Sequence, residues 1–89
     1  MAESTGDKKY SKSLLGKTVV SKAGKRLGIV GDLIFEVRTG ELIYLVIKQP
    51  STYALSMELE KTKDGEPMVP FSAMISSSDF VVIAEEDIV

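Results

Sequence analysis

The sequence has 89 residues, enough for one small domain and too few for two. It contains no cysteine and no histidine, which excludes disulfides, Cys/His zinc sites, cysteine nucleophiles and histidine-based triads. The net charge of −2 disfavours general nucleic-acid binding, because such binding needs several cations that face phosphates.

Positive charge is concentrated near the start of the chain and negative charge in the remainder. Seven basic and two acidic residues precede Leu27, whereas four basic and eleven acidic residues follow from there onward. A molecule polarised in this way attracts a charged partner or another copy of itself.

Residues 1–13 are polar, and Tyr10 is the one side chain among them that is suited to burial. This composition predicts a flexible N-terminal tail ahead of a domain that spans residues 14–89. The lysines of this segment could touch anionic lipid, RNA or an acidic protein, although a solubilising tail is the simpler interpretation. The longest apolar run covers only residues 42–47, against the roughly 20 residues of a membrane helix. We therefore expect a cytoplasmic protein with no transmembrane segment.

The first half of the domain carries three predicted strands. A β-branched run predicts a strand over 18–21, followed by a glycine-containing turn. Alternation over 27–37 predicts a second strand, whose core face would carry Ile29, Leu33, Phe35 and Val37. Gly40 supplies the positive φ of a hairpin turn, and residues 42–48 return as a central apolar strand.

The second half is less regular. Residues 53–59 alternate between apolar and polar, which favours a strand, although a short helix also fits them. A short strand over 66–69 ends at Pro70, residues 71–74 predict one helical turn, and residues 76–79 predict a turn. Residues 80–83 form the last predicted strand. Five or six short strands without a long helix indicate an all-β fold, a small and partly open barrel.

Several residues are expected to act structurally. Gly16, Gly28 and Gly40 suit turns and bulges, since no helix start or Gly-Lys-Ser/Thr sequence makes a phosphate loop of them. Asp32 lies inside an apolar strand, where we expect a partly buried carboxylate that accepts hydrogen bonds from turn backbone. Pro70 is expected to end its strand.

No catalytic, cofactor or metal site is expected. The serines at 72 and 76–78 have no histidine to activate them, and nothing in the sequence places Lys17 or Lys48 beside one. The carboxylates of residues 85–87 would point alternately to opposite sides of an extended chain, so they would not converge on a cation.

The apolar content exceeds what one small barrel can cover. Both faces of the 42–47 run are apolar, and further apolar residues follow along 53–59. This surplus predicts a symmetric homodimer, unless residues 51–63 fold over the barrel and hide it. The candidate interface residues are Tyr44, Val46, Tyr53, Leu55 and Met57.

The order of short motifs resembles one family. Leu15-Gly16-Lys17 and Val19-Val20 open the domain, and Gly28-x-Val30-x-Asp32 leads into an apolar strand. Thr39-Gly40, Tyr44–Ile47, Val69-Pro70-Phe71 and Asp79-x-Val81-Val82 then follow in order. This set resembles the PRC-barrel family, which implies a small β-barrel of that type.

Within that family, the sequence is similar to the short stand-alone archaeal proteins. Some of these are CdpB-like cell-division adaptors, which implies binding to a SepF-like protein of the FtsZ ring and pairing with itself or a paralogous PRC-barrel protein. The resemblance thus implies a non-enzymatic dimeric adaptor recruited to the division site through a partner. The alternatives are a ribosome-assembly or RNA-processing factor resembling the barrel domain of RimM, and a small-ligand-responsive module.

Overall fold

The computed structural model describes residues 13–88, so the predicted tail lies outside the described residues except for Ser13. Within that range the strands are β1 Thr18–Ser21, β2 Arg26–Phe35, β3 Leu42–Lys48, β4 Glu60–Lys61, β5 Pro67–Pro70, β6 Met74–Ser77 and β7 Phe80–Ile83. The helical segments are α2 Thr52–Ser56 and two 3-10 turns, η1 Phe71–Ala73 and η2 Glu85–Asp87. The predicted all-β class is confirmed, with one short helix.

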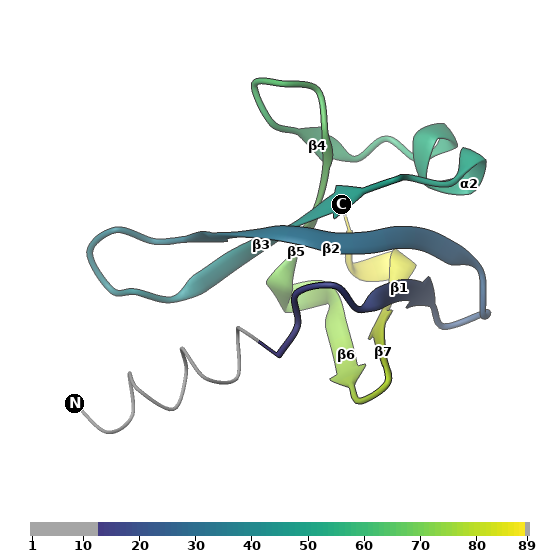
Figure 1. Ribbon diagram of the computed structural model, residues 1–89, viewed down its shortest axis with the longest axis horizontal. Coiled ribbons are helices and arrows are strands. Elements are labelled where there is room, and N and C mark those ends of the chain that lie inside the picture. The colour runs from purple at the N-terminus through teal and green to yellow at the C-terminus, as the bar shows by residue number, and fades with distance from the viewer. Residues whose placement is uncertain (1–12, 89) are drawn as a thin grey trace.

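All strands of the described range belong to one sheet, in the order β4-β5-β3-β2-β1-β7-β6 (Figure 1). Neighbouring strands are antiparallel, except that β1 and β7 run parallel. The β1–β7 pair joins the beginning of the described chain to its end. The sheet curls around its core without closing, and β4 and β6 are its two end strands.

The core is built from buried aliphatic side chains of the strands and of the segments that connect them. They are Leu14, Val19, Leu27, Val30, Leu45, Ile47, Ala54, Leu59, Val69, Ala73, Val81 and Ile83. Burial of a valine, leucine or isoleucine side chain contributes about 1.5–3 kcal/mol, so these contacts dominate the stability of the domain.

Two bulges in β2 change which of its side chains face this core. Val19 and Val20 of β1 pair with Gly28 and Arg26, which leaves Leu27 as an extra residue. On the β3 side, Gly31 is the extra residue. Each extra residue reverses the alternation of the strand. The reversal brings Leu27 and Val30 into the core and packs Leu33 against it.

The predicted core face of β2 is therefore wrong in part. Leu33 packs against the core, but Ile29 is only half-buried, Phe35 is 40% exposed and Val37 is 96% exposed. The strand also ends at Phe35, two residues earlier than expected. The hairpin turn itself is as predicted. Gly40 has φ +77°, and its N–H donates to the carbonyl of Glu36 at 2.8 Å.

The segment that follows β3 begins with a helix, α2. The strand favoured by the alternation over 53–59 is therefore wrong, and the short helix that also fitted these residues is confirmed over Thr52–Ser56. Ser51 caps α2, because its Oγ accepts a hydrogen bond from the N–H of Ala54 at 3.1 Å. The same hydroxyl donates to the carbonyl of Arg26 at 2.6 Å. Ala54 is buried, so this one small side chain anchors the helix against the core.

The predicted turn over 76–79 begins too early. Met74–Ser77 form the strand β6, in which Met74 pairs with Ile83 and Ser77 pairs with Val81. Pairing with the apolar strand β7 therefore overrides the turn preference of serine. The helical turn expected over 71–74 is confirmed as η1, and the strand over 80–83 is confirmed as β7. Among residues 13–88, none of the helices has the length and apolar character needed to cross a membrane.

Replacement of Gly28 by alanine is expected to destabilise the protein, because β2 and β3 approach closely there. A Cβ at this position would lie 2.5 Å from Cγ2 of Ile47 and 2.7 Å from the carbonyl oxygen of Lys48. We expect a loss of about 1–3 kcal/mol in the free energy of unfolding, measured by urea denaturation. The control is Gly65→Asn, since asparagine tolerates positive φ and a Cβ at Gly65 meets nothing within 4 Å. Equal stability of the two variants would contradict the prediction.

Candidate functional site

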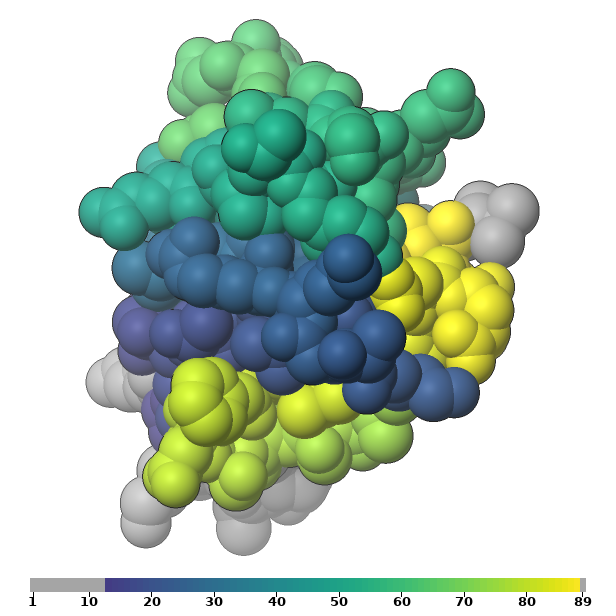
Figure 2. Space-filling view, turned by 90° about the vertical axis from the view of Figure 1, so that its right-hand side faces the viewer, coloured from purple at the N-terminus to yellow at the C-terminus, as the bar shows by residue number. Residues whose placement is uncertain are grey.

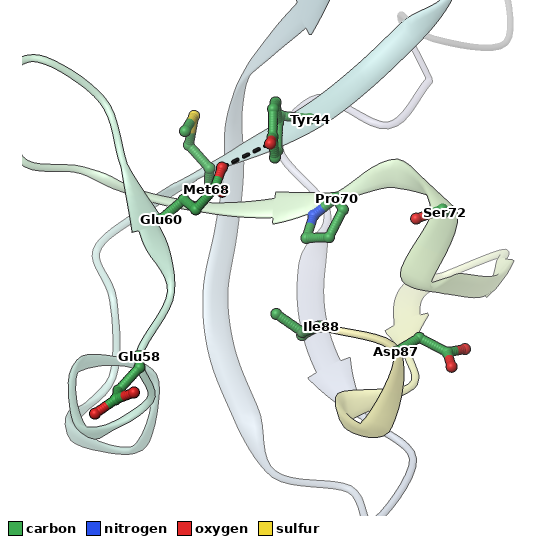
Figure 3. A pocket seen from close by; sticks show the side chains of 8 residues that line it. All are labelled: Tyr44, Glu58, Glu60, Met68, Pro70, Ser72, Asp87 and Ile88. Atoms are coloured by element: carbon green, nitrogen blue, oxygen red, sulfur yellow. Dashed lines mark hydrogen bonds between the residues drawn. The ribbon is translucent and has the colours of Figure 1, made fainter.

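A small pocket of about 200 Å³ opens between the β3–β5 part of the sheet and the C-terminal η2 segment (Figure 3). Its walls come from the connection into β4, from strands β3 to β5, and from η1 and η2. The lining residues are Tyr44, Glu58, Glu60, Met68, Pro70, Ser72, Asp87 and Ile88. Four stretches of the sequence therefore contribute to one pocket.

The sheet positions a hydrogen bond at this pocket. Tyr44 of β3 pairs with Pro70 of β5, and Glu60 of β4 pairs with Met68 of the same strand. The Tyr44 hydroxyl donates to Oε1 of Glu60 at 2.6 Å (Figure 3). This hydrogen bond, followed by desolvation and the carboxylate charge, raises the pKa of Tyr44 above its ordinary value. Glu60 is thereby held in one orientation at the rim.

The pocket combines negative charge with an apolar lining. Its charged groups are the carboxylates of Glu58, Glu60 and Asp87, and no lysine or arginine lines it. The side chains of Met68, Pro70 and Ile88 provide apolar surface between them. Within residues 13–88, no group of three or more carboxylates is arranged to hold a metal ion. The pocket is therefore suited to a cationic group with an apolar stem.

A second contact between charged side chains involves η2 itself and lies on the side of the molecule shown in Figure 2. There the turn between β1 and β2, in blue, adjoins the yellow C-terminal segment. Lys22 Nζ donates to Oε2 of Glu86 at 2.8 Å, which raises the pKa of Lys22 and lowers that of Glu86. Both side chains are more than half exposed, so this ion pair stabilises the fold only slightly.

The predicted interface residues do not form one surface. Tyr44 lines the pocket, but Val46 is only 3% exposed, so its assignment to an interface is corrected: it packs inside the domain. Tyr53 and Met57 are half-buried and pack against the core. Leu55 alone of the five is well exposed, at 58%, because it lies on the outer side of α2. The helix thus separates residues that an extended strand would have aligned.

The residues predicted to be structural fall into two groups. Gly16, Gly28 and Gly40 all have positive φ, and the N–H of Gly16 donates to the carbonyl of Val30 at 2.8 Å. Pro70 is the last residue of β5 and also lines the pocket. Asp32 departs from the expectation of partial burial. It is exposed, and its Oδ1 accepts a hydrogen bond from the N–H of Leu33 rather than from turn backbone.

Sequence reasoning missed the surface of the β2–β3 hairpin and the three pocket carboxylates. The hairpin surface was missed because strict alternation assigned Phe35 and Val37 to the core. The carboxylates lie in different segments and share no motif. No local sequence signal locates the pocket, because it depends on the long-range pairing of Tyr44 with Pro70, which places β5 beside β3.

The lysines considered as partners for serine hydroxyls are engaged elsewhere. Lys17 Nζ donates to the backbone carbonyl of Ser78, and Lys48 forms an ion pair with Glu66. Neither contact involves a serine hydroxyl. The remaining predicted lysine contacts, those of the segment before residue 13, lie outside the described residues.

The Tyr44–Glu60 hydrogen bond predicts a measurable titration shift. The raised folded-state pKa means that the stabilisation is fully present below the unfolded value of about 10 and is lost as pH rises through the folded value. In a tyrosine 13Cζ NMR titration, Glu60→Gln is expected to move the pKa of Tyr44 down toward its ordinary value. Glu58→Gln is the control and is expected to leave it in place. An unchanged Tyr44 titration in Glu60→Gln would contradict the assignment.

Comparison with known proteins assigns the family. Comparison with curated proteins gave no match to the chain. The sequence profile described as the PRC-barrel domain matches residues 6–85, which is nearly the whole chain. This range contains every strand described above and all but two of the pocket residues. The chain therefore belongs to the PRC-barrel family.

Proposed function

We propose that this protein is a non-enzymatic, dimeric, protein-binding adaptor. The observation that carries the proposal is the number of large apolar side chains left in water by so small a domain. Within the described residues, side chains of this kind that are at least 40% exposed are Leu15, Phe35, Val37, Leu55, Ile75 and Phe80. Single exposed apolar residues are ordinary, but gathered ones mark interaction surfaces.

These side chains lie at several separate places on the molecule. Phe35 and Val37 belong to the β2–β3 hairpin, and Leu55 lies on α2. Ile75 and Phe80 lie on the paired strands β6 and β7. Self-association at one surface leaves the others for a different partner. A dimer then presents two copies of each remaining surface, which strengthens binding to a partner that is itself oligomeric.

The absence of catalysis is part of the proposal. Nucleophilic catalysis needs a base within hydrogen-bond reach, and the sequence offers no histidine for that role. Lys17 and Lys48 are engaged by a carbonyl and a carboxylate. The pocket volume of about 200 Å³ is also below the roughly 300–1,000 Å³ of ordinary small-molecule sites, which favours binding of a protein side chain over a metabolite.

The specific partner we propose is a SepF-like protein of FtsZ-based archaeal cell division. Its support is the resemblance of the motif order to short archaeal PRC-barrel adaptors, together with membership of the family. The competing role in ribosome assembly or RNA processing would call for a basic surface. Eleven acidic and four basic residues from Leu27 onward disfavour it.

A tagged pull-down from nuclease-treated native lysate tests the adaptor and its partner together. We expect enrichment of SepF or FtsZ. Leu55→Glu is expected to lower that recovery at least tenfold, since a central interface side chain contributes about 2 kcal/mol or more. Phe80→Ser, which also removes an exposed apolar side chain, is the matched control and is expected to retain the partner. Enrichment of ribosomal proteins without SepF would contradict the division role.

A further inference from the structure

The β2–β3 hairpin extends beyond the curled part of the sheet (Figure 1). Hydrogen bonds from Glu36 N–H to the carbonyl of Glu41 and from Gly40 N–H to the carbonyl of Glu36 hold its end. Phe35 and Val37 on this hairpin remain 40% and 96% exposed. A two-stranded ribbon that is not packed on both sides is marginally stable in water, so contact with a second surface would stabilise it.

The end of the hairpin also carries one cation, Arg38, which lies in the sequence between the carboxylates of Glu36 and Glu41. Arg38 follows Val37 and is exposed. Between residues 13 and 88, the ion pairs join Lys22 to Glu86 and Lys48 to Glu66, so the Arg38 guanidinium takes part in neither. The hairpin therefore presents an apolar side chain and an unpaired cation next to each other.

The pocket beside η2 has the complementary properties. Glu58, Glu60 and Asp87 surround it, and none of these carboxylates forms an ion pair with a described residue. Met68 and Ile88 add apolar surface to the lining of the pocket (Figure 3). An arginine side chain has an apolar stem and a cationic head with five donors, and it forms strong hydrogen bonds with carboxylates.

We propose that the hairpin end of a second copy docks at this pocket. In that contact Arg38 lies among the carboxylates, and Val37 packs against the apolar lining. In the proposed dimer a two-fold axis relates the two copies, so that each hairpin occupies the pocket of the other copy and the contact does not continue into an open chain. The inference rests on the dimer of the proposed function and adds the surfaces that form it. It leaves Leu55, Ile75 and Phe80 free for other partners.

The experiment measures self-association of the full chain by sedimentation equilibrium. The wild type is expected as a dimer of twice the 9.7 kDa chain mass. Arg38→Glu places like charges together, as does the double variant Glu58→Lys/Glu60→Lys. Each is expected to weaken dimerisation at least tenfold. Asp79→Lys changes an exposed charge away from both surfaces and is the control, with an unchanged dimer.

Mixing the two weakened variants distinguishes the specific contact from general charge effects. In the mixed dimer, the glutamate introduced by R38E would face the two introduced lysines at one contact. At the other contact, the unaltered Arg38 would face the unaltered pocket. We therefore expect a heterodimer about as tight as the wild type. Circular dichroism checks that each variant is folded, and Arg38→Gln with Glu58→Gln/Glu60→Gln gives a milder pair if either unfolds.

Two further results would each overturn part of the proposal. Variants that dimerise as tightly as the wild type, or a mixture that stays monomeric, would overturn the hairpin–pocket contact and leave the dimer standing. A wild type that is monomeric at millimolar concentration would overturn the dimer of the proposed function as well. Weaker self-association of the wild type at high salt would agree with a charge-assisted contact.

Discussion

The two bulges in β2 are the constraint on which the rest of the structure depends. A regular ten-residue strand would present every second side chain to one face. The extra residues at Leu27 and Gly31 instead bring Leu27, Val30 and Leu33 to the same side. Bulges also bend and twist a strand, which allows one sheet to curl around a core as small as this one. The close approach of Gly28 to β3 is a consequence of the same bend.

The functional surfaces follow from that geometry. The pairing of β5 with β3 and the curl of the sheet toward the C-terminal turn η2 bring carboxylates from separate segments to the lining of one pocket. Phe35 and Val37 are exposed because the hairpin extends beyond the curled part of the sheet, where no core covers them (Figure 1). The pocket therefore depends on the pairing of the strands, and the exposed hairpin end depends on the length of β2 and β3 beyond the core.

The sequence predicted strands best where β-branched or apolar runs lie between turn residues. The strands at 18–21, 42–48 and 80–83 match those of the structure. Prediction from the sequence failed where the periodicity of apolar residues was ambiguous or was interrupted by a bulge. Alternation over 53–59 suits strand or helix, and the cap at Ser51 decides for the helix. Alternation places Phe35 on the same side as Leu33, and local sequence does not show that the hairpin runs beyond the core, so the exposure of Phe35 could not be deduced.

The candidate site was predictable to a smaller extent. Tyr44 was identified from the surplus of apolar residues, but Glu58, Glu60 and Asp87 come to the lining of one pocket only through the sheet order. Val46 was predicted to lie at an interface because both faces of the 42–47 run are apolar, but it is only 3% exposed, so the domain itself covers both faces of the strand at this position. Long-range pairing, which local sequence does not encode, thus decides which surfaces are available.

The opposing charges of the two ends of the sequence are partly neutralised within the fold. Lys22 pairs with Glu86, and Lys25 Nζ lies 5.4 Å from the centre of the Tyr53 ring. The basic turn between β1 and β2 is thereby engaged, whereas the pocket carboxylates and Arg38 are not paired with charges of the described chain. Exposed ion pairs contribute little affinity, but complementary charges orient an encounter and disfavour wrong partners. Affinity at such a contact must therefore come mainly from apolar side chains, and Val37 lies directly beside Arg38 where that contribution is needed.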